Sequence, residues 1–199
     1  MTLLVEYSDA SADVREVYDE IIAQLGFAAV PNFFKAQAPT PWVLFASWDA
    51  VKRLLVGGRV DRVLKELILI EVSRRNHCHY CEAAHFALCE KLDYKSRLDE
   101  RRTLPSRSLA MIEVALLSIA PEDGAGVTAR CAEHNISEDE RRELVGMAAL
   151  SHYLNGIATG LRVPLDEQLR ETADRVLTET AMRDILSRIA TICSAFDRR

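Results

Sequence analysis

The sequence is poor in the residues that interrupt regular structure, because its 199 residues include only 8 glycines and 6 prolines. Such low usage disfavours all-β and loop-dominated folds. No uninterrupted apolar run approaches the roughly 20 residues that a membrane-spanning helix needs. The amino terminus lacks a basic region followed by a long apolar stretch, so no signal peptide is expected. These features together predict a globular cytoplasmic protein that does not contact membranes.

An excess of positive charge is also missing, since 25 Lys and Arg residues stand against 30 Asp and Glu residues, for a net charge of −5. Binding to nucleic acid or to an anionic membrane normally requires a basic patch, so both functions are disfavoured. No glycine-rich phosphate-binding loop is present, so we expect neither a flavin nor a nicotinamide cofactor. The five cysteines are an odd number in a chain without an export signal, which argues against a secreted disulfide scaffold.

Apolar residues recur at three- and four-residue steps almost throughout the chain, which predicts an all-α fold. The predicted helices cover residues 14–25, 41–55, 60–75, 78–91, 109–119, 137–161 and 185–196. The helix over 60–75 is apolar nearly all round, as is typical of a buried helix. Ser137 and Glu140 have the spacing of a capping box at the start of another helix. We predict one domain over residues 1–199, with a helical lead-in (1–40), a core (41–166) and C-terminal helices (167–199).

The chemistry is expected in the segment from Asn76 to His85, where a C-x-x-C motif (Cys78 and Cys81) is followed by a histidine. On a helix these three side chains share one face. Unpaired N–H groups at a helix start stabilise a thiolate and lower the thiol pKa. An imidazole one turn away can accept or return the proton. Two thiols and an acid–base group within mutual reach suit the two-electron reduction of an electrophilic oxygen.

Two other interpretations of this cluster stay open. Cys78, Cys81 and His85, with His77 or His79, could supply four zinc ligands, although no second ligand pair with metal-site spacing is present. Alternatively, the thiols are buried core residues, since free cysteine is among the most buried residue types. Cys89, one turn beyond His85, is expected to pack as a small apolar residue.

The motif resembles the alkylhydroperoxidase D-like (AhpD-like), peroxidase-related branch of the carboxymuconolactone decarboxylase superfamily. The resemblance extends to residues 31–35 before the motif, to residues 143–155 in a later helix and to residues 163–166 after it. It implies a thiol-dependent peroxidase with an AhpD-like helical fold. It further implies a homo-oligomer, as a trimer or hexamer, and an external dithiol reductant similar to lipoamide or thioredoxin.

The same resemblance assigns roles to four residues. Cys81 would attack the hydroperoxide and become a sulfenic acid, and Cys78 would condense with it to a disulfide. His85 and Glu66 would form the proton relay. The apolar neighbours of Glu66 independently predict that its carboxyl is partly desolvated. Glu71 is the rival carboxylate, but Arg75 is its expected surface partner at i,i+4.

One position departs from the family pattern, because Tyr80 stands where the best-known branch has a further histidine before the second cysteine. A phenol cannot replace an imidazole as a base near neutral pH, although it can donate a hydrogen bond. The expected relay is therefore shorter, and His77 and His79 are expected in an exposed turn. The alternative functions are a lactone enzyme like the superfamily's namesake, which needs no C-x-x-C, and a non-catalytic redox or zinc module.

Overall fold

The computed structural model describes residues 3–99, 103–119 and 124–194, and within these ranges the regular structure is helical. This confirms the predicted all-α fold. The helices in chain order are η1 (Tyr7–Asp9), α1 (Ala12–Leu25), α2 (Asn32–Lys35), α3 (Pro41–Ala50), η2 (Val51–Val56), α4 (Arg62–Arg75), α5 (His79–Lys91), η3 (Tyr94–Arg97), α6 (Ser106–Leu117), α7 (Gly124–Glu133), α8 (Glu138–Gly160), α9 (Glu167–Thr178) and α10 (Thr180–Ser194). Phe196, the last residue of the predicted C-terminal helix, lies outside the described residues.

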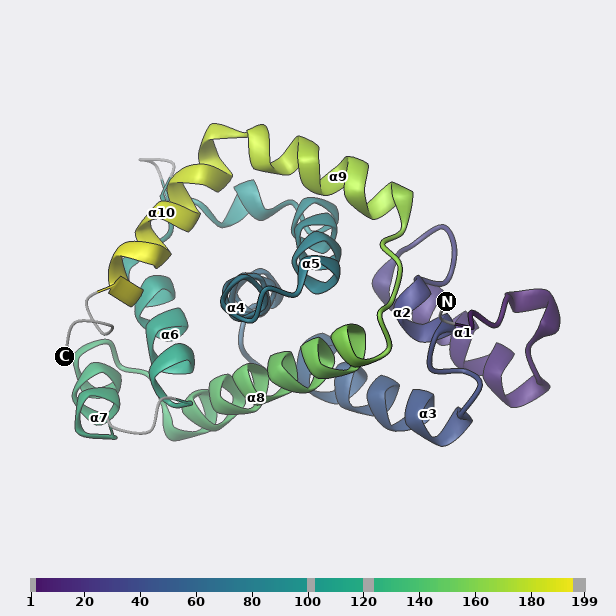
Figure 1. Cartoon of the computed structure of the whole chain (residues 1–199). Helices are drawn as coiled ribbons and strands as arrows, with labels where there is room; N and C mark the ends of the chain where they lie inside the picture. The colour runs from purple at the N-terminus through teal and green to yellow at the C-terminus, as the bar shows by residue number, and fades with distance from the viewer. Residues whose placement is uncertain (1–2, 100–102, 120–123, 195–199) are drawn as a thin grey trace.

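Helix α4 occupies the centre of the molecule, with the other long helices arranged around it (Figure 1). Every residue from Val63 to Ser73 is buried, as the continuous apolar pattern predicted. Its start is fixed by Asp61, whose carboxylate accepts a hydrogen bond from the Val63 backbone N–H at 2.9 Å. A central helix of this kind provides a rigid support for the side chains that it presents to α5 and α8.

Helix α8 packs against α4, and it begins at the predicted capping box. The Ser137 hydroxyl accepts from the Glu140 backbone N–H at 3.2 Å, while the Glu140 carboxylate accepts from the Ser137 N–H at 2.8 Å. Two otherwise unpaired donors of the first turn are thereby satisfied. The helix then continues for 23 residues, which brings its C-terminal half beside the start of α5.

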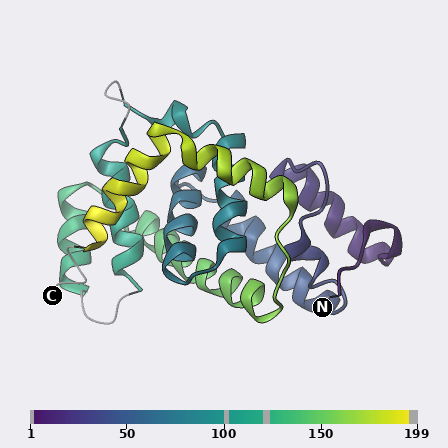
Figure 2. The same cartoon turned by 45° about the horizontal axis from the view of Figure 1, so that its top comes forward.

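Helices α9 and α10 cross over α5 and α6 and close one side of the bundle (Figure 2). Helices α1, α2 and α3 lie together at the opposite end of the molecule from α6 and α7 (Figure 1). No helix in the described ranges combines the length and apolar character needed to cross a bilayer.

Candidate active site

A tight turn between α4 and α5 places the first cysteine at the start of α5. His77 adopts a left-handed backbone conformation with φ of 54°, which His tolerates better than most residues. The turn is closed by a hydrogen bond from the Cys78 N–H to the Ser73 carbonyl at 2.9 Å. Cys78 is consequently the N-cap residue of α5, and Cys81 lies in the first turn of that helix.

Cys78 and Cys81 are both free thiols and both buried. The pKa of Cys78 is lowered from 9.0 to about 6, chiefly because the Cys81 thiol donates a hydrogen bond to its sulfur. The Cys81 backbone N–H and the Thr159 hydroxyl act in the same direction, as does the charge of His85 when that imidazole is protonated, while burial opposes them. The helix start therefore favours a thiolate at Cys78.

The pKa of Cys81 is raised for the complementary reason. Its thiol donates to Cys78, and burial next to that negative sulfur further disfavours a second charge. A hydrogen bond with Asn155 acts in the opposite direction. The pair thus shares one proton, with the thiol at Cys81 and the thiolate at Cys78.

The predicted relay residues are in direct contact. His85 Nδ1 lies 2.6 Å from Glu66 Oε2, and the Glu66 side chain is fully buried between α4 and α5. The other carboxylate oxygen, Oε1, accepts from Arg62 Nε at 2.6 Å. A carboxylate that is bound to a guanidinium acts as an acceptor. This arrangement favours the His85 tautomer with hydrogen on Nδ1, which leaves Nε2 as the free base.

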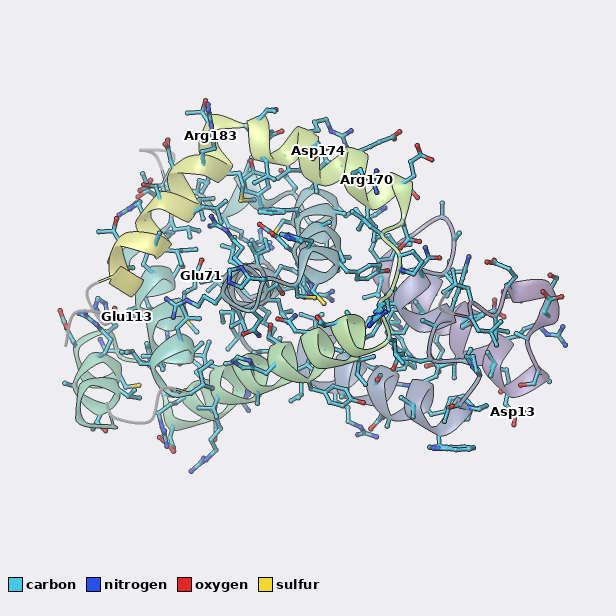
Figure 3. The ribbon with its side chains drawn as sticks, viewed as in Figure 1. Asp13, Glu71, Glu113, Arg170, Asp174 and Arg183 are labelled. Atoms are coloured by element: carbon cyan, nitrogen blue, oxygen red, sulfur yellow. The ribbon has the colours of Figure 1, made fainter. Side chains whose placement is uncertain are left out.

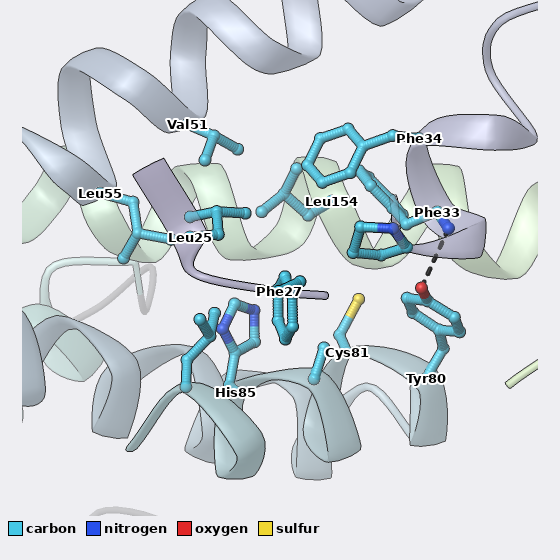
Figure 4. Close-up of a pocket in the computed structure, with 13 residues that line it drawn as sticks. Leu25, Phe27, Phe33, Phe34, Val51, Leu55, Tyr80, Cys81, His85 and Leu154 are labelled. Atoms are coloured by element: carbon cyan, nitrogen blue, oxygen red, sulfur yellow. Dashed lines mark hydrogen bonds between the residues drawn. The ribbon is translucent and has the colours of Figure 1, made fainter. Parts of the chain in front are cut away.

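Cys81 and His85 line the same cavity of about 50 Å³. Both side chains point into it from α5, and Phe33 and Phe34 of α2 approach it from the other side (Figure 4). Apart from Cys81, His85 and Tyr80, the lining residues are apolar: Leu25, Phe27, Pro31, Phe33, Phe34, Val51, Leu55, Ala84, Leu88 and Leu154. The cavity thus presents one thiol and one imidazole to an otherwise apolar space.

Three residues at this site were missed by the sequence analysis. Arg62 had a readable signal, because it precedes Glu66 by four residues on one helix. Asn155 and Thr159 reach the two sulfurs from α8, and this contact depends on tertiary packing, which local spacing does not reveal. The Asn155 amide is buried and fixed, since its oxygen accepts from Asn76 Nδ2 at 2.8 Å and its nitrogen donates to Ser73 Oγ at 3.0 Å.

Tyr80 lies outside the proton relay. Its hydroxyl donates to Asp166 Oδ2 at 2.8 Å and accepts from the Phe33 backbone N–H at 2.9 Å. Burial raises the pKa of this phenol well above its ordinary value, and the nearby Asp166 carboxylate adds to the effect. Tyr80 is therefore a neutral hydrogen-bonding group at neutral pH.

The rival carboxylate Glu71 does not line the cavity. It extends from α4 toward α6 (Figure 3), and its Oε1 lies 3.1 Å from Arg75 Nε. The expected pairing is present, but the expected surface location is wrong, because Glu71 is 6% exposed. Burial follows from the position of α4 at the centre of the bundle.

The remaining candidates of the sequence analysis lie where they were expected. His77 and His79 are exposed in or next to the turn. Cys89 is fully buried, and burial raises its thiol pKa well above the ordinary value. Within the described part of the chain, no three His, Cys, Asp or Glu side chains converge as metal ligands.

Comparison with known families gives a match over the part of the chain that carries this site. Residues 43–95 match the carboxymuconolactone decarboxylase family, and this segment contains Glu66, Cys78, Cys81 and His85. No curated protein matches the chain by sequence.

Solved structures share most of this fold. One is a peroxidase-related protein with an alkylhydroperoxidase AhpD core from Ralstonia eutropha JMP134, with a TM-score of 0.70, 22% identity and coverage of 82% of this chain and 90% of that one. A peroxidase-related protein from Silicibacter sp. TM1040 gives a TM-score of 0.70 and 20% identity over 84% of this chain and 93% of that one. A variant of the debrominase Bmp8, solved in complex with 2,3,4-tribromopyrrole, gives a TM-score of 0.68 and 17% identity, with coverage of 88% of this chain and 97% of that one. At these identities the likeness establishes the fold.

Proposed function

We propose that this chain, whose residues 43–95 match the carboxymuconolactone decarboxylase family and whose fold is shared with AhpD-like proteins, belongs to the AhpD-like branch of that superfamily and is a thiol-dependent peroxidase. Its substrate is an organic hydroperoxide, and its electrons come from the Cys78–Cys81 dithiol. The observation that carries this proposal is that Cys81 and His85, which is bound to Glu66, line one largely apolar cavity. Cys78, whose pKa is lowered, lies beside Cys81.

Cys81 is the attacking residue in this proposal, because it is the cysteine that lines the cavity. As the Cys81 sulfur attacks the distal peroxide oxygen, its proton passes to His85 Nε2 in the same step, so that no second thiolate forms beside that of Cys78. The O–O bond breaks, the alkoxide takes the proton back from His85 and leaves as the alcohol, and Cys81 is now a sulfenic acid. His85 acts as base and then as acid in this sequence.

Cys78 resolves the sulfenic acid. Its thiolate is already present near neutral pH, so it attacks the Cys81 sulfur without a further base. The S–S bond forms, hydroxide leaves, and a proton converts the hydroxide to water. The net change is reduction of one hydroperoxide to an alcohol and water, with oxidation of two thiols to a disulfide.

The cycle then needs an external dithiol to reduce the Cys78–Cys81 disulfide. We propose a lipoamide- or thioredoxin-like donor and a homo-oligomeric enzyme, a trimer or hexamer, as the resemblance implies. Sedimentation velocity tests the assembly directly, because these states have three or six times the 22.3 kDa mass of the chain.

The experiment that tests the function is a single-turnover assay on the fully reduced protein with cumene hydroperoxide. We expect one equivalent of alcohol per chain and the loss of two thiols, located to Cys78 and Cys81 by peptide mass spectrometry. Cys81→Ser should abolish alcohol formation, whereas Cys78→Ser should form alcohol once and stop at a sulfenic acid that dimedone traps.

Wild-type turnover by Cys81→Ser would show that Cys81 is not the nucleophile. Activity toward a lactone that survives alkylation of every thiol would favour the decarboxylase alternative. About one zinc per chain in freshly purified protein would instead favour a non-catalytic zinc module.

A second candidate reaction is the reductive removal of bromine from an aromatic ring. The observation that favours it is the apolar, aromatic-lined cavity next to Cys81, together with the shared fold of a debrominase that binds a tribromopyrrole. Replacement of a C–Br bond by C–H consumes two electrons and one proton and releases bromide, and the same dithiol supplies those electrons. Bromide release from 2,3,4-tribromopyrrole, without alcohol formation from cumene hydroperoxide, would favour this reaction.

A further inference from the structure

The residue directly before the attacking cysteine ties two distant segments of the chain together. The Tyr80 hydroxyl accepts a hydrogen bond from the Phe33 N–H of α2 and donates one to Asp166, the residue before α9. The bond to Phe33 is visible at the edge of the cavity (Figure 4). One buried side chain thus connects α5, α2 and the start of α9.

Asp166 strengthens the same connection. Its two carboxylate oxygens each lie 3.2 Å from the Asn32 backbone N–H, at the first residue of α2. The Asn32 side chain donates in turn to the Pro164 carbonyl at 3.1 Å. A carboxylate at a helix start satisfies donors that have no partner within the helix. The four-residue α2 is therefore held from outside at its first turn.

The held helix forms a wall of the cavity. Phe33 and Phe34 line it, and the Phe33 ring stacks on the Tyr80 ring with centroids 6.2 Å apart. On the other side of the wall lies an outer hollow of about 280 Å³, lined in part by Pro31, Asn32 and Asp166. The cavity and the hollow share Phe27 and Pro31 as lining residues. Displacement of α2 would thus join a small inner space to a much larger outer one.

We propose that Tyr80 sets the size selectivity of the cavity at Cys81, by holding α2 in place through Asp166 and the Phe33 backbone. This inference deepens the proposed function, and its relevance to catalysis rests on that function. Tyr80 is a positioning residue here, because its hydroxyl acts on the cavity wall and not on the reacting sulfur. With the hydrogen bonds of Tyr80 intact, wide substrates reach Cys81 more slowly than slender ones, and loss of these bonds reduces that discrimination.

The test compares a small and a bulky thiol reagent at Cys81 in the reduced protein. The reference protein and every variant in it carry Cys78→Ser, because the Cys78 thiolate would otherwise react first and because its removal also removes the main cause of the raised Cys81 pKa. Iodoacetamide and N-(1-pyrenyl)maleimide are reacted separately, and alkylation of Cys81 is followed by peptide mass spectrometry. In Tyr80→Phe we expect the ratio of bulky to small reagent rates to rise severalfold above the reference ratio. Alkylation requires no turnover, so the result stands even if the chain reduces no hydroperoxide.

Tyr94→Phe is the matched control. Tyr94 is also a buried tyrosine whose hydroxyl donates to a carboxylate, that of Glu179, but it does not line the cavity. In Tyr94→Phe, the ratio of bulky to small reagent rates at Cys81 should equal the reference ratio. Asp166→Ala removes the carboxylate that accepts from Tyr80, without changing an aromatic ring. It should also raise the ratio of bulky to small reagent rates, and it replaces Tyr80→Phe as the test if that variant fails to fold.

An unchanged ratio in the folded Tyr80→Phe or Asp166→Ala protein would overturn the proposal. An equal increase with both reagents would also overturn it, because it indicates general loosening in place of size selection. If the wild type does reduce hydroperoxides, the ratio of kcat/KM for cumene hydroperoxide to that for hydrogen peroxide should rise in Tyr80→Phe and stay constant in Tyr94→Phe.

Discussion

At the scale of the residue, the two cysteines differ although they are three positions apart on one helix. Cys78 has the helix-start N–H of Cys81, the Thr159 hydroxyl and the Cys81 thiol directed at its sulfur. Cys81 has the apolar cavity on one side and a negative sulfur on the other. The electrostatic cost of two adjacent thiolates keeps one proton on the pair. The position of that proton determines which sulfur is ionised at rest.

This difference predicts the pH dependence of alkylation. Because the pKa of Cys78 is lowered to about 6, its reaction with iodoacetamide should rise as the pH increases through about 6 and level off above it. Cys81→Ala removes the donor thiol, so the midpoint should move upward, toward the ordinary value. Thiolate absorbance at 240 nm and mass spectrometry of the Cys78 peptide both report the midpoint. A midpoint near 9 in the wild type would contradict the assignment.

The relay carboxylate predicts a second residue-scale effect. Glu66→Gln removes the charge that orients His85 and also leaves Arg62 without its ion-pair partner. Loss of a working acid–base group costs about 100-fold in rate or more, so we expect hydroperoxide turnover to fall about 100-fold. Steady-state assays below the melting temperature measure this effect.

Glu71→Gln is the control for that substitution. Glu71 is a buried carboxylate of the same helix that is bound to arginine, but it does not line the cavity. Turnover per folded molecule should stay at the wild-type level. Equal losses in Glu66→Gln and Glu71→Gln would indicate that the first effect is destabilisation and not a failed relay.

At the scale of the element, a buried lysine holds the junction between η2 and α4. The Lys65 side chain is fully buried, and its ammonium donates to the carbonyls of Leu54 and Gly57 and pairs with Glu143 of α8. Glu143 in turn accepts from the backbone N–H groups of Arg59 and Val60 at 2.9 and 3.1 Å. Carbonyls at the end of η2 that have no partner within the helix are satisfied in this way. The junction fixes where α4, and therefore Glu66, begins.

Gly58 at this junction predicts a large effect on stability. Its φ is +93°, and a Cβ at this position would lie 2.1 Å from Glu143 Oε1 and 2.8 Å from Lys65 Nζ. Both neighbours are held by several hydrogen bonds, so neither moves freely. Backbone strain and overpacking together should lower the free energy of unfolding of Gly58→Ala by about 2–4 kcal/mol.

Gly156→Ala is the matched control for Gly58→Ala. Gly156 lies inside α8, and a Cβ there would meet nothing within 4 Å. Alanine should therefore stabilise the helix by about 0.5–1 kcal/mol. Urea unfolding of both variants measures the two changes. A neutral Gly58→Ala would show that the ion pair at this junction rearranges at little cost.

Some of the helices could be predicted from the sequence alone, and others could not. Burial of α4 and the start of α8 were predictable, because a continuous apolar run and the Ser137–Glu140 spacing are local signals. The sequence analysis missed α7, whose first turn contains two glycines. It predicted an unbroken helix over residues 41–55, whereas the structure changes to the π-helical η2 after Ala50. Contacts from other elements, such as that of Lys65, are not encoded in local spacing.

The same division applies to the site. The motif residues and Glu66 were predictable from spacing and resemblance, and the structure brings His85 and Glu66 together. The surface location assigned to Glu71 was wrong, because burial depends on where α4 lies in the bundle. The role of Tyr80 depends on Phe33 and Asp166, which are 47 and 86 residues away in the chain. The individual catalytic roles of Cys78, Cys81, His85 and Glu66 stay predictions.

At the scale of the whole molecule, the C-terminal helices complete the core around the site. Helix α9 buries Leu169, Ala173 and Val176, and α10 buries Met182, Ile185 and Ile189. On the surface, Arg175 of α9 donates to both carboxylate oxygens of Glu90 in α5, at 3.0 and 2.6 Å. Helix α9 thus covers the helix that carries the C-x-x-C motif, and α10 packs against α6.

This arrangement predicts that residues 1–166, without α9 and α10, do not suffice for folding. Each buried large apolar side chain contributes about 1.5–3 kcal/mol, and a whole domain is stable by only about 5–15 kcal/mol. A chain that ends at Asp166 loses several such contributions and exposes apolar faces of α5 and α6. We expect it to lose cooperative thermal unfolding by circular dichroism and to lose the pH midpoint near 6 at Cys78. If the shortened chain melts cooperatively and keeps that midpoint, then α9 and α10 are accessory to the fold, and the catalytic unit is smaller than the whole molecule.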